Sequence, residues 1–265
     1  MLYFTISHGQ SSTVLRSTIE LRDLHESAHN PQTLAPQLEW LREARGRGLL
    51  SRLPEELVTA VVTVGQRVQY PPGTLALRWD ESPKTGIVLR GTLRAFIALP
   101  DGGQVTTRYL RAGDVTGVFA PRQPHLARGV QALESCEMLF IDAARVKELS
   151  MTKPLFAWEM IEELTTVLNS THKAMYVRAY GSLRQRVVTA ILDRAEALGG
   201  VTAGQSVPGT QHELANGVGS VREVVANVLQ ALKREGLVDI RRGGLVILEP
   251  DRLIDEATAG LGLAT

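Results

Sequence analysis

The alternation of apolar and polar positions follows one rhythm in the first half of the chain and another in the second. From about residue 66 to 142, short apolar segments such as 86–89, 93–97 and 138–141 are separated by turn signals. These signals recur roughly every ten residues, which is typical of short antiparallel strands in a sandwich or barrel. They are Pro72-Gly73, Ser82-Pro83, Arg90-Gly91, Gly102-Gly103 and Gly113-Asp114. The pattern predicts an all-β unit, which follows a short helix over residues 54–64.

After Pro154 the pattern becomes helical, and apolar or seam-like positions recur at alternating intervals of three and four residues. This heptad spacing is typical of a helix that packs against a second helix. The predicted seam consists of Trp158, Ile161, Thr165, Leu168, His172 and Met175. A helix that packs only on its own domain usually has a wider apolar stripe, so we expect a dimer seam and keep a core-facing helix as the alternative. The polar pair, Thr165 and His172, could fix the register of the seam or form a buried hydrogen-bonded pair.

The most informative pattern lies between residues 210 and 234. Thr210 and Glu213 form a capping box that opens a short helix, and a break over residues 217–219 ends it. Ser220, with Glu223 three residues on, then opens a longer helix. Its inward stripe is predicted to contain Val221, Val224, Val225, Val228, Leu229 and Leu232. Two capped helices joined by a glycine-containing turn are typical of a helix-turn-helix.

A β-hairpin with a basic tip is expected after Gly236, because residues 237–240 and 245–248 flank the sequence Arg241-Arg242-Gly243-Gly244. In the major groove an arginine can bind guanine, and a glutamate can accept a hydrogen bond from cytosine. Side chains and backbone N–H groups at helix N-termini hold phosphates. Each arginine alone could be an ordinary surface charge, but the order of elements predicts a winged DNA-binding unit. The predicted DNA contacts are Gln211, Ser220, Val221, Arg222, Glu223, Asn227, Arg241 and Arg242.

The amino-acid composition excludes several classes of protein. The 29 basic and 28 acidic residues leave a formal charge of +1, which excludes a histone-like protein and an acidic tail. Cys136 is the one cysteine, which excludes an intrachain disulfide and a four-cysteine iron–sulfur site. The N-terminal sequence MLYFTISHGQSS does not have the pattern of a signal peptide, and no apolar run reaches 18 residues. We therefore expect a cytoplasmic protein with no membrane partner.

The order of β-roll, long helix and winged helix-turn-helix over residues 49–250 resembles the Crp/Fnr-type (catabolite activator protein-like) transcription regulators. Gly113-Asp114 followed by Gly117 is similar to the "GD..G" corner of that family. Residues 132–142 are similar to its last roll strands, and residues 218–225 to the entry of its recognition helix.

The resemblance implies an α+β fold with an N-terminal cyclic-nucleotide-binding-type β-roll (jelly roll), a long dimerisation helix and a C-terminal winged helix-turn-helix. The expected division is an extension over residues 1–48, the roll over 49–152, the long helix over 153–180 and the DNA-binding domain over 181–265. The resemblance also implies a homodimer that regulates transcription from a palindromic site. Its expected partners are double-stranded DNA and a second copy of the chain, with RNA polymerase as a further candidate.

The predicted effector pocket departs from the pattern of the cyclic-AMP binders in this family, which carry Gly-Glu and, about ten residues later, Arg followed by Ser or Thr. Here Val118 follows Gly117, and two ways of counting place either Leu126-Ala127 or Arg128-Gly129 at the second position. On the long helix, Thr171 falls where those relatives place a base-contacting Thr, and His172 follows it where a Ser is usual. The candidate effector residues are Gly117, Val118, Arg128, Thr171 and His172. We expect an altered pocket that is not an ordinary cyclic AMP sensor. A cyclic nucleotide is kept as a candidate cofactor, but no particular nucleotide is assigned. No metal is expected.

Two other functions remain to be weighed. A cyclic-nucleotide-binding module could act on a protein partner, although the expected wing and capped helices argue against it. A cupin-like metalloenzyme would need several histidines and a carboxylate, but residues 66–142 contain only His125. The chain also lacks the GxSxG and P-loop motifs; residues 25–29 (HESAH) match HExxH, but they lie in a polar, irregular segment, whereas that zinc motif acts on a helix. The expected protein is therefore not an enzyme and has no catalytic residues.

Overall fold

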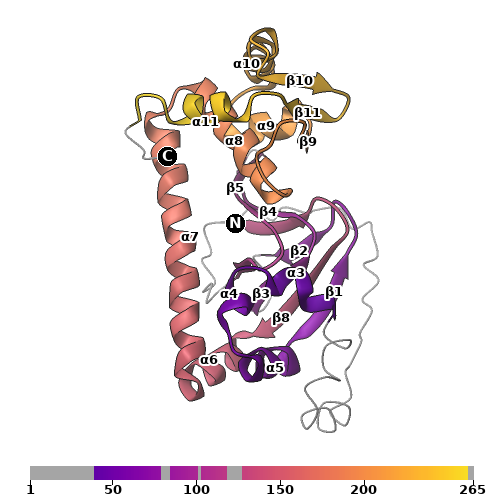
Figure 1. The fold of residues 1–265 in the computed structure, drawn as a ribbon, viewed down its shortest axis with the longest axis vertical. Helices are drawn as coiled ribbons and strands as arrows, with labels where there is room; N and C mark the ends of the chain where they lie inside the picture. Colours follow the sequence, from indigo (N-terminus) through magenta and orange to yellow (C-terminus); the bar gives the residue numbers. More distant parts are fainter. Residues whose placement is uncertain (1–38, 79–83, 101–102, 118–126, 262–265) are drawn as a thin grey trace.

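A computed structural model describes residues 39–78, 84–100, 103–117 and 127–261. Figure 1 shows a β-roll, one long helix that runs along its side, and a smaller helical domain at the far end of that helix. This arrangement confirms the predicted fold class: a roll, a long helix and a winged helix-turn-helix in that order along the chain.

The roll consists of two antiparallel four-stranded sheets, with strand orders β1-β8-β3-β6 and β2-β7-β4-β5. The strands are β1 (Gln66–Tyr70), β2 (Leu75–Arg78), β3 (Lys84–Arg90), β4 (Leu93–Ala98), β5 (Gln104–Leu110), β6 (Val115–Thr116), β7 (Arg128–Ala132) and β8 (Cys136–Asp142). Successive side chains of strand β8 point to opposite sides of the sheet, and both sides are buried. Met138 packs inside the roll, whereas Leu139 packs on the outer layer of helices.

That outer layer contains a short 3₁₀ segment, η1 (Glu39–Leu41), and the helices α3 (Arg42–Arg45), α4 (Leu49–Arg52), α5 (Glu55–Val64) and α6 (Ala143–Thr152). The predicted extension over residues 1–48 therefore needs a correction, because its last part belongs to the roll. Leu41 and Ala44 are fully buried in the same core as Leu49, Leu50 and Val58. Residues 1–38 lie outside the described part of the chain.

Helix α7 (Pro154–Tyr180) forms one side of the molecule (Figure 1). Its inner face buries Phe156, Met160, Glu163 and Val177. Its opposite face carries the predicted seam, and all six seam residues are exposed in this single chain. None of the helices in the described ranges is long and apolar enough to cross a membrane.

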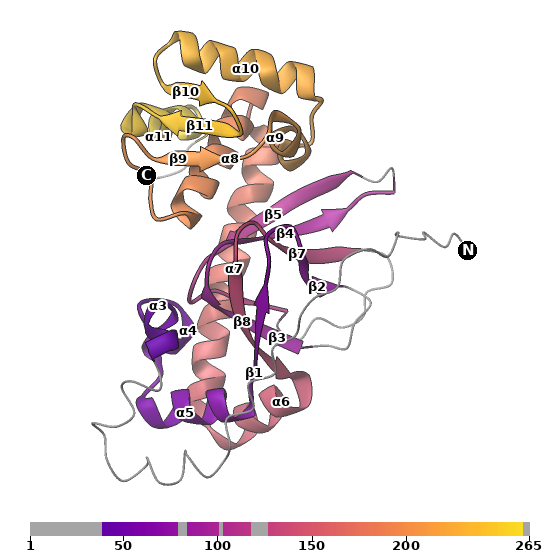
Figure 2. The same ribbon diagram turned by 90° about the vertical axis from the view of Figure 1, so that its right-hand side faces the viewer.

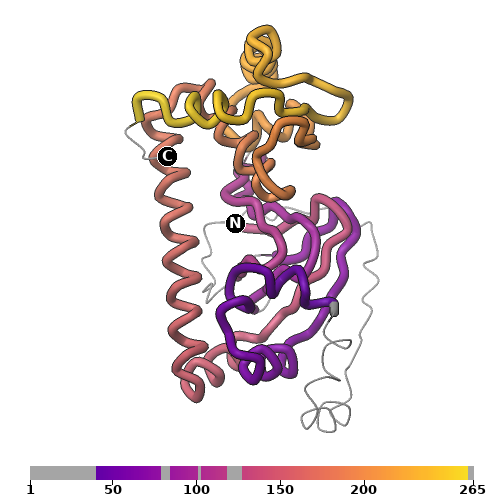
Figure 3. The backbone as a smooth tube through the Cα atoms, viewed as in Figure 1, coloured from indigo at the N-terminus to yellow at the C-terminus, as the bar shows by residue number. Residues whose placement is uncertain are grey.

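The DNA-binding domain contains the helices α8 (Leu183–Ala197), α9 (Gln211–Val218), α10 (Arg222–Arg234) and α11 (Pro250–Thr258). A small antiparallel sheet of order β10-β11-β9 completes it, with β9 (Ser206–Pro208), β10 (Val238–Arg241) and β11 (Gly244–Ile247). After α11 the chain turns back toward the upper end of α7 (Figure 3), where the Tyr176 hydroxyl donates to the Leu261 carbonyl at 2.9 Å.

Two local details differ from the sequence expectation. Helix α9 continues through Gly217 to Val218, and Gly219, with φ +66°, ends it in the left-handed conformation. Val221, rather than Ser220, is the N-cap of α10, and it supplies no side-chain hydrogen bond. The capping box of α9 is as predicted, since Thr210 Oγ1 accepts from the Glu213 backbone N–H at 3.1 Å and Glu213 accepts from the Thr210 N–H at 3.0 Å.

Candidate nucleic-acid interface

The outermost element of the molecule is α10, which lies across the end of the DNA-binding domain farthest from the roll (Figure 2). Its inward positions, Val225, Leu229 and Leu232, are buried in the core of this domain. Their spacing of four and three residues places them on one side of the helix. The opposite side of α10 faces away from the rest of the chain.

The base-reading candidates are exposed in the N-terminal half of α10. Arg222 and Glu223 are exposed in the first turn of α10, and Asn227 is exposed one turn later. Val221, just before the helix, is exposed as well. The two remaining candidates near helix N-termini, Gln211 and Ser220, are both half-buried.

The wing forms beside α10. Strands β10 and β11 pair from Val238 with Ile247 to Arg241 with Gly244, which leaves Arg242 and Gly243 as the turn. Gly243 has φ +82°, a conformation that glycine adopts without strain. Arg241 and Arg242 are both exposed at this tip. A groove runs between the wing and the two helices, lined by residues that include Thr210, Gln211, His212, Arg222, Arg241 and Gly244.

Acidic side chains engage some of the cations in this region. Asp239 contacts Arg241 at 3.2 Å and Lys233 at 3.4 Å. The hydrogen bond from Arg241, followed by that from Lys233, holds the pKa of Asp239 below its usual range. Arg184 binds Glu235 and Glu256 on the side of the domain that α11 covers. No such ion pair within the described ranges involves Arg222, so its guanidinium is available at the surface.

Val224 is an exposed apolar residue of α10 that was not predicted as a contact. Val224 was expected to face inward, but 42% of its surface is exposed. It lies next to Glu223 and one turn before Asn227. The signal that could have placed it is helical geometry: Val224 is about 100° away from Val225, the first residue of the buried side.

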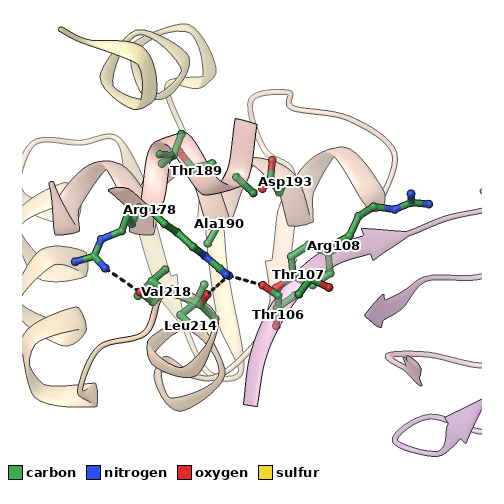
Figure 4. Close-up of a pocket in the computed structure, with 14 residues that line it drawn as sticks. Thr106, Thr107, Arg108, Arg178, Thr189, Ala190, Asp193, Leu214 and Val218 are labelled. Atoms are coloured by element: carbon green, nitrogen blue, oxygen red, sulfur yellow. Dashed lines mark hydrogen bonds between the residues drawn. The ribbon is translucent and has the colours of Figure 1, made fainter. Parts of the chain in front are cut away.

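Several hydrogen bonds join the DNA-binding domain to the roll. Arg178, near the end of α7, donates from one nitrogen to the Thr106 carbonyl at 2.6 Å and to the Gly217 carbonyl at 3.1 Å. Figure 4 shows this guanidinium between β5 and α9. Arg111 donates to the carbonyl and the carboxylate of Glu196 at the end of α8. The helix-turn-helix is therefore docked on the β4–β5 hairpin.

A cleft opens beside these contacts and is lined by residues of β5, α7, α8 and α9 (Figure 4). Asp193 lines this cleft, and part of the residue is exposed to solvent. Burial raises the pKa of Asp193 to about 6, although Lys173 and Arg178 act in the opposite direction. Arg194, on the same helix, is buried and lies 5.6 Å from the centre of the Tyr109 ring.

The predicted effector residues do not form one site. Gly117 has φ +73°, and an added Cβ would lie 2.4 Å from the Lys84 carbonyl oxygen. Arg128 is exposed, whereas Gly129 is buried against the Phe96 ring, so the Arg128 side chain does not point into the roll. Thr171 and His172 are exposed on α7, and Val118 lies outside the described residues.

A charged network occupies the space between the roll and α7. Arg108 extends from β5, is mostly buried, and donates to the Val115 carbonyl at 3.2 Å. Burial lowers the pKa of Arg108, while the nearby carboxylates of Asp114 and Glu163 act to raise it. From the N-terminal helices, Arg47 pairs with Asp114 at 3.0 Å and Arg52 pairs with Glu159 and Glu163 on α7. Sequence reasoning missed this network because its members are separated by up to about 110 residues.

Comparison with known proteins supports the same two-domain organisation. The model of the cyclic nucleotide-binding domain family matches residues 67–153, and that of the Crp-like helix-turn-helix domain matches residues 185–256. The chain is 25% identical over 181 residues to the cAMP-activated global transcriptional regulator Vfr of Pseudomonas aeruginosa, which covers 66% of this chain and 85% of Vfr. It is 26% identical over 219 residues to the cyclic AMP receptor protein of Thermus thermophilus, which covers 82% of this chain and 99% of that protein.

A solved structure has the same fold. A transcriptional regulator of the Crp/Fnr family from Eubacterium rectale matches with a TM-score of 0.65 and 21% identity, over 80% of this chain and 98% of that one. The two matched domains, their order and the exposed recognition helix favour a regulator over the cupin-like enzyme and over a signalling module without DNA. The chain belongs to the Crp/Fnr-type family of DNA-binding transcription regulators.

Proposed function

We propose that this regulator acts as a homodimer on a twofold-symmetric DNA site and that ordinary cyclic AMP is not its effector. The observation that carries the DNA-binding mode is the N-terminal half of α10, where Arg222, Glu223 and Asn227 are all exposed. These types match guanine, cytosine and adenine edges in the major groove. The arginines of the wing, Arg241 and Arg242, would hold phosphates.

The dimer is supported by the uncovered face of α7. Trp158, Ile161, Leu168 and Met175 are each more than half exposed in the single chain, at heptad spacing. Large apolar side chains in a continuous stripe mark an interaction surface. A second α7 packed on this stripe would bury it, and binding to adjacent major grooves requires that the two recognition helices then lie about 34 Å apart, one helical turn of DNA.

The altered effector pocket is supported by the charges between the roll and α7. Vfr is named as cAMP-activated, but the sequence here has Val118 where cyclic-AMP binders have a glutamate. Arg128 is exposed, and Arg108 already has an acidic partner in Asp114 at 4.0 Å. A cyclic phosphate placed in this region would lack the ribose acceptor and the hydroxyl that those relatives provide.

DNA recognition is tested by selecting a binding site from a random palindrome library and comparing two arginine variants. R222A should weaken binding to the selected site by about 1–3 kcal/mol, relax the preference at one base pair, and leave non-specific binding unchanged. R242A, the control in the wing, should weaken specific and non-specific binding equally and reduce the salt dependence. Equal losses for R222A on both kinds of DNA would contradict the base-reading role.

The dimer and the effector need separate measurements. L168E, on the seam, should give monomers in sedimentation velocity and lose binding to the full palindrome. T166E, an exposed neighbour off the seam, should remain dimeric. A dimeric L168E would exclude the seam.

Calorimetry should detect no micromolar binding of cyclic AMP, and such binding would refute the altered pocket. Binding of cyclic dinucleotides is measured in parallel.

A further inference from the structure

Two exposed valines stand at the start of α10. Val221, the N-cap, is 60% exposed, and Val224, in the first turn, is 42% exposed. Neither belongs to the buried core of the DNA-binding domain, although Val225 beside them is fully buried there. The outward side of the recognition helix therefore has an apolar patch among its polar side chains.

The stability of the helix does not account for these residues. A β-branched side chain lowers helix propensity relative to alanine, glutamate or lysine at an exposed position. Valine is also among the poor N-cap residues, because it has no side-chain acceptor for the free N–H groups of the first turn. Ser220 precedes the N-cap but does not act as one. Both valines thus stand where a polar residue would make a more stable helix.

The position of Val224 indicates what it contacts. It lies three residues after Val221 and three residues before Asn227, so its side chain adjoins both of these exposed residues on the helix surface. Thymine alone among the four bases presents a methyl group in the major groove, and that group is read by apolar contact. A valine cannot read any base edge by a hydrogen bond.

We propose that Val224 is a specificity-determining residue that contacts the C5-methyl group of a thymine in each half-site. The inference rests on the proposed function, because it requires α10 to enter the major groove. It adds a base preference that the polar residues do not supply: an A·T pair in one orientation at the position beneath Val224. The exposed apolar patch is then covered by DNA in the complex.

Replacing thymine by uracil in the selected site removes only the C5-methyl group and leaves every hydrogen-bonding group in place. Binding is measured for sites in which one thymine position at a time is changed symmetrically in both half-sites. For the wild-type dimer, one position should cost about fourfold per half-site, or about 16-fold for the symmetric pair, as expected for the loss of one buried methyl group. The other positions should show little change.

The same scan on V224A completes a double-mutant cycle. V224A should bind the thymine site more weakly than the wild type, and its penalty for uracil at that position should fall to nearly one-fold. V224T, which keeps the branched shape but exchanges one methyl for a hydroxyl, should give an intermediate penalty. Q230A, a control at another exposed position of α10, should keep the full wild-type penalty. Equal melting temperatures of the variants establish that each is folded.

The outcomes separate this inference from the proposed function. If a specific site is selected but uracil is tolerated at every position, or if V224A keeps the full penalty, the thymine contact is wrong while the DNA-binding mode stands. If the selection enriches no sequence, the proposed DNA-binding mode fails and the inference falls with it. A loss of affinity on uracil substitution that is present in the wild type and absent in V224A supports both the thymine contact and the proposed DNA-binding mode.

Discussion

Gly48 is the residue whose replacement the backbone tolerates least. It has φ +69° and faces Gly113, which has φ +90°, so that two main chains meet without side chains between them. A Cβ on Gly48 would lie 2.0 Å from the Gly113 carbonyl oxygen. This approach anchors the N-terminal helices to the Gly113-Asp114 corner, where Arg47 also pairs with Asp114.

We expect G48A to destabilise the roll more than G73A does. Gly73 has a similar φ of +82° but nothing within 4 Å of its would-be Cβ, so G73A carries only the cost of the left-handed backbone, about 1–2 kcal/mol. G48A should add a further ~1–3 kcal/mol for the overlap with Gly113. Urea unfolding of the two variants measures the difference. Equal losses would mean that the N-terminal segment moves away from the roll at little cost.

At the scale of elements, α4 and α7 are joined by Arg52, which pairs with Glu159 and Glu163. Glu163 is only 7% exposed, so loss of Arg52 would leave its side chain buried without this ion pair. We expect R52M to lower the free energy of unfolding by about 1–2 kcal/mol, less than for a fully buried pair because Arg52 is itself partly exposed. E163Q added to R52M should restore part of the loss, since it removes one unpaired carboxylate.

Surface pairs provide the control for this prediction. Arg145 and Glu148 form an exposed pair at 2.8 Å on α6, and R145A should change the stability by less than about 0.5 kcal/mol. Hydrogen exchange should be faster in the N-terminal half of α7 in R52M than in R145A. If both variants exchange alike, the charges between α4 and α7 do not hold the helix against the roll.

Local signals in the sequence predicted most of the elements but not how distant ones meet. The capping box of Thr210 and Glu213, the heptad spacing of α7 and the turn rhythm of the roll all depend on residues a few positions apart. A second box, Ser182 with Gln185 at the start of α8, has the same signal and was overlooked. The burial of Leu41 and the contact of Gly48 with Gly113 arise only in the folded chain. The seam and DNA contacts remain predictions, since a single chain does not test them.

In the whole molecule, the sensor-like roll and the DNA-binding domain share a polar interface. Arg178 joins β5 to α9, and Arg111 joins the end of β5 to α8. Arg178 is also the last-turn residue of α7, the helix that carries the predicted dimer seam. A shift of α7 relative to the roll would therefore act on the position of the helix-turn-helix through the hydrogen bonds that the Arg178 side chain donates to the Thr106 and Gly217 carbonyls.

Asp193 makes this interface depend on pH. Its pKa of about 6 in the folded chain lies above the ordinary value of 3.8, so the folded state binds this proton more tightly than the unfolded state does. Its contribution to stability is therefore greatest below about pH 4, is lost as the pH rises to about 6, and stays absent above that. The D193N variant has no carboxyl group at this position and so does not lose stability in this way as the pH rises. We expect it to match the wild type near pH 4 and to melt at a higher temperature at pH 7.

Asp239 offers a control of opposite sign. Hydrogen bonds from Arg241 and Lys233 lower its pKa, so D239N should melt below the wild type at pH 7, and the difference should vanish as the pH falls below 3.8 and through the lowered pKa. Thermal melts of the three proteins between pH 2 and 8 measure both effects. A D193N curve parallel to that of the wild type would show that the Asp193 carboxylate is as well solvated between the domains as in the unfolded chain.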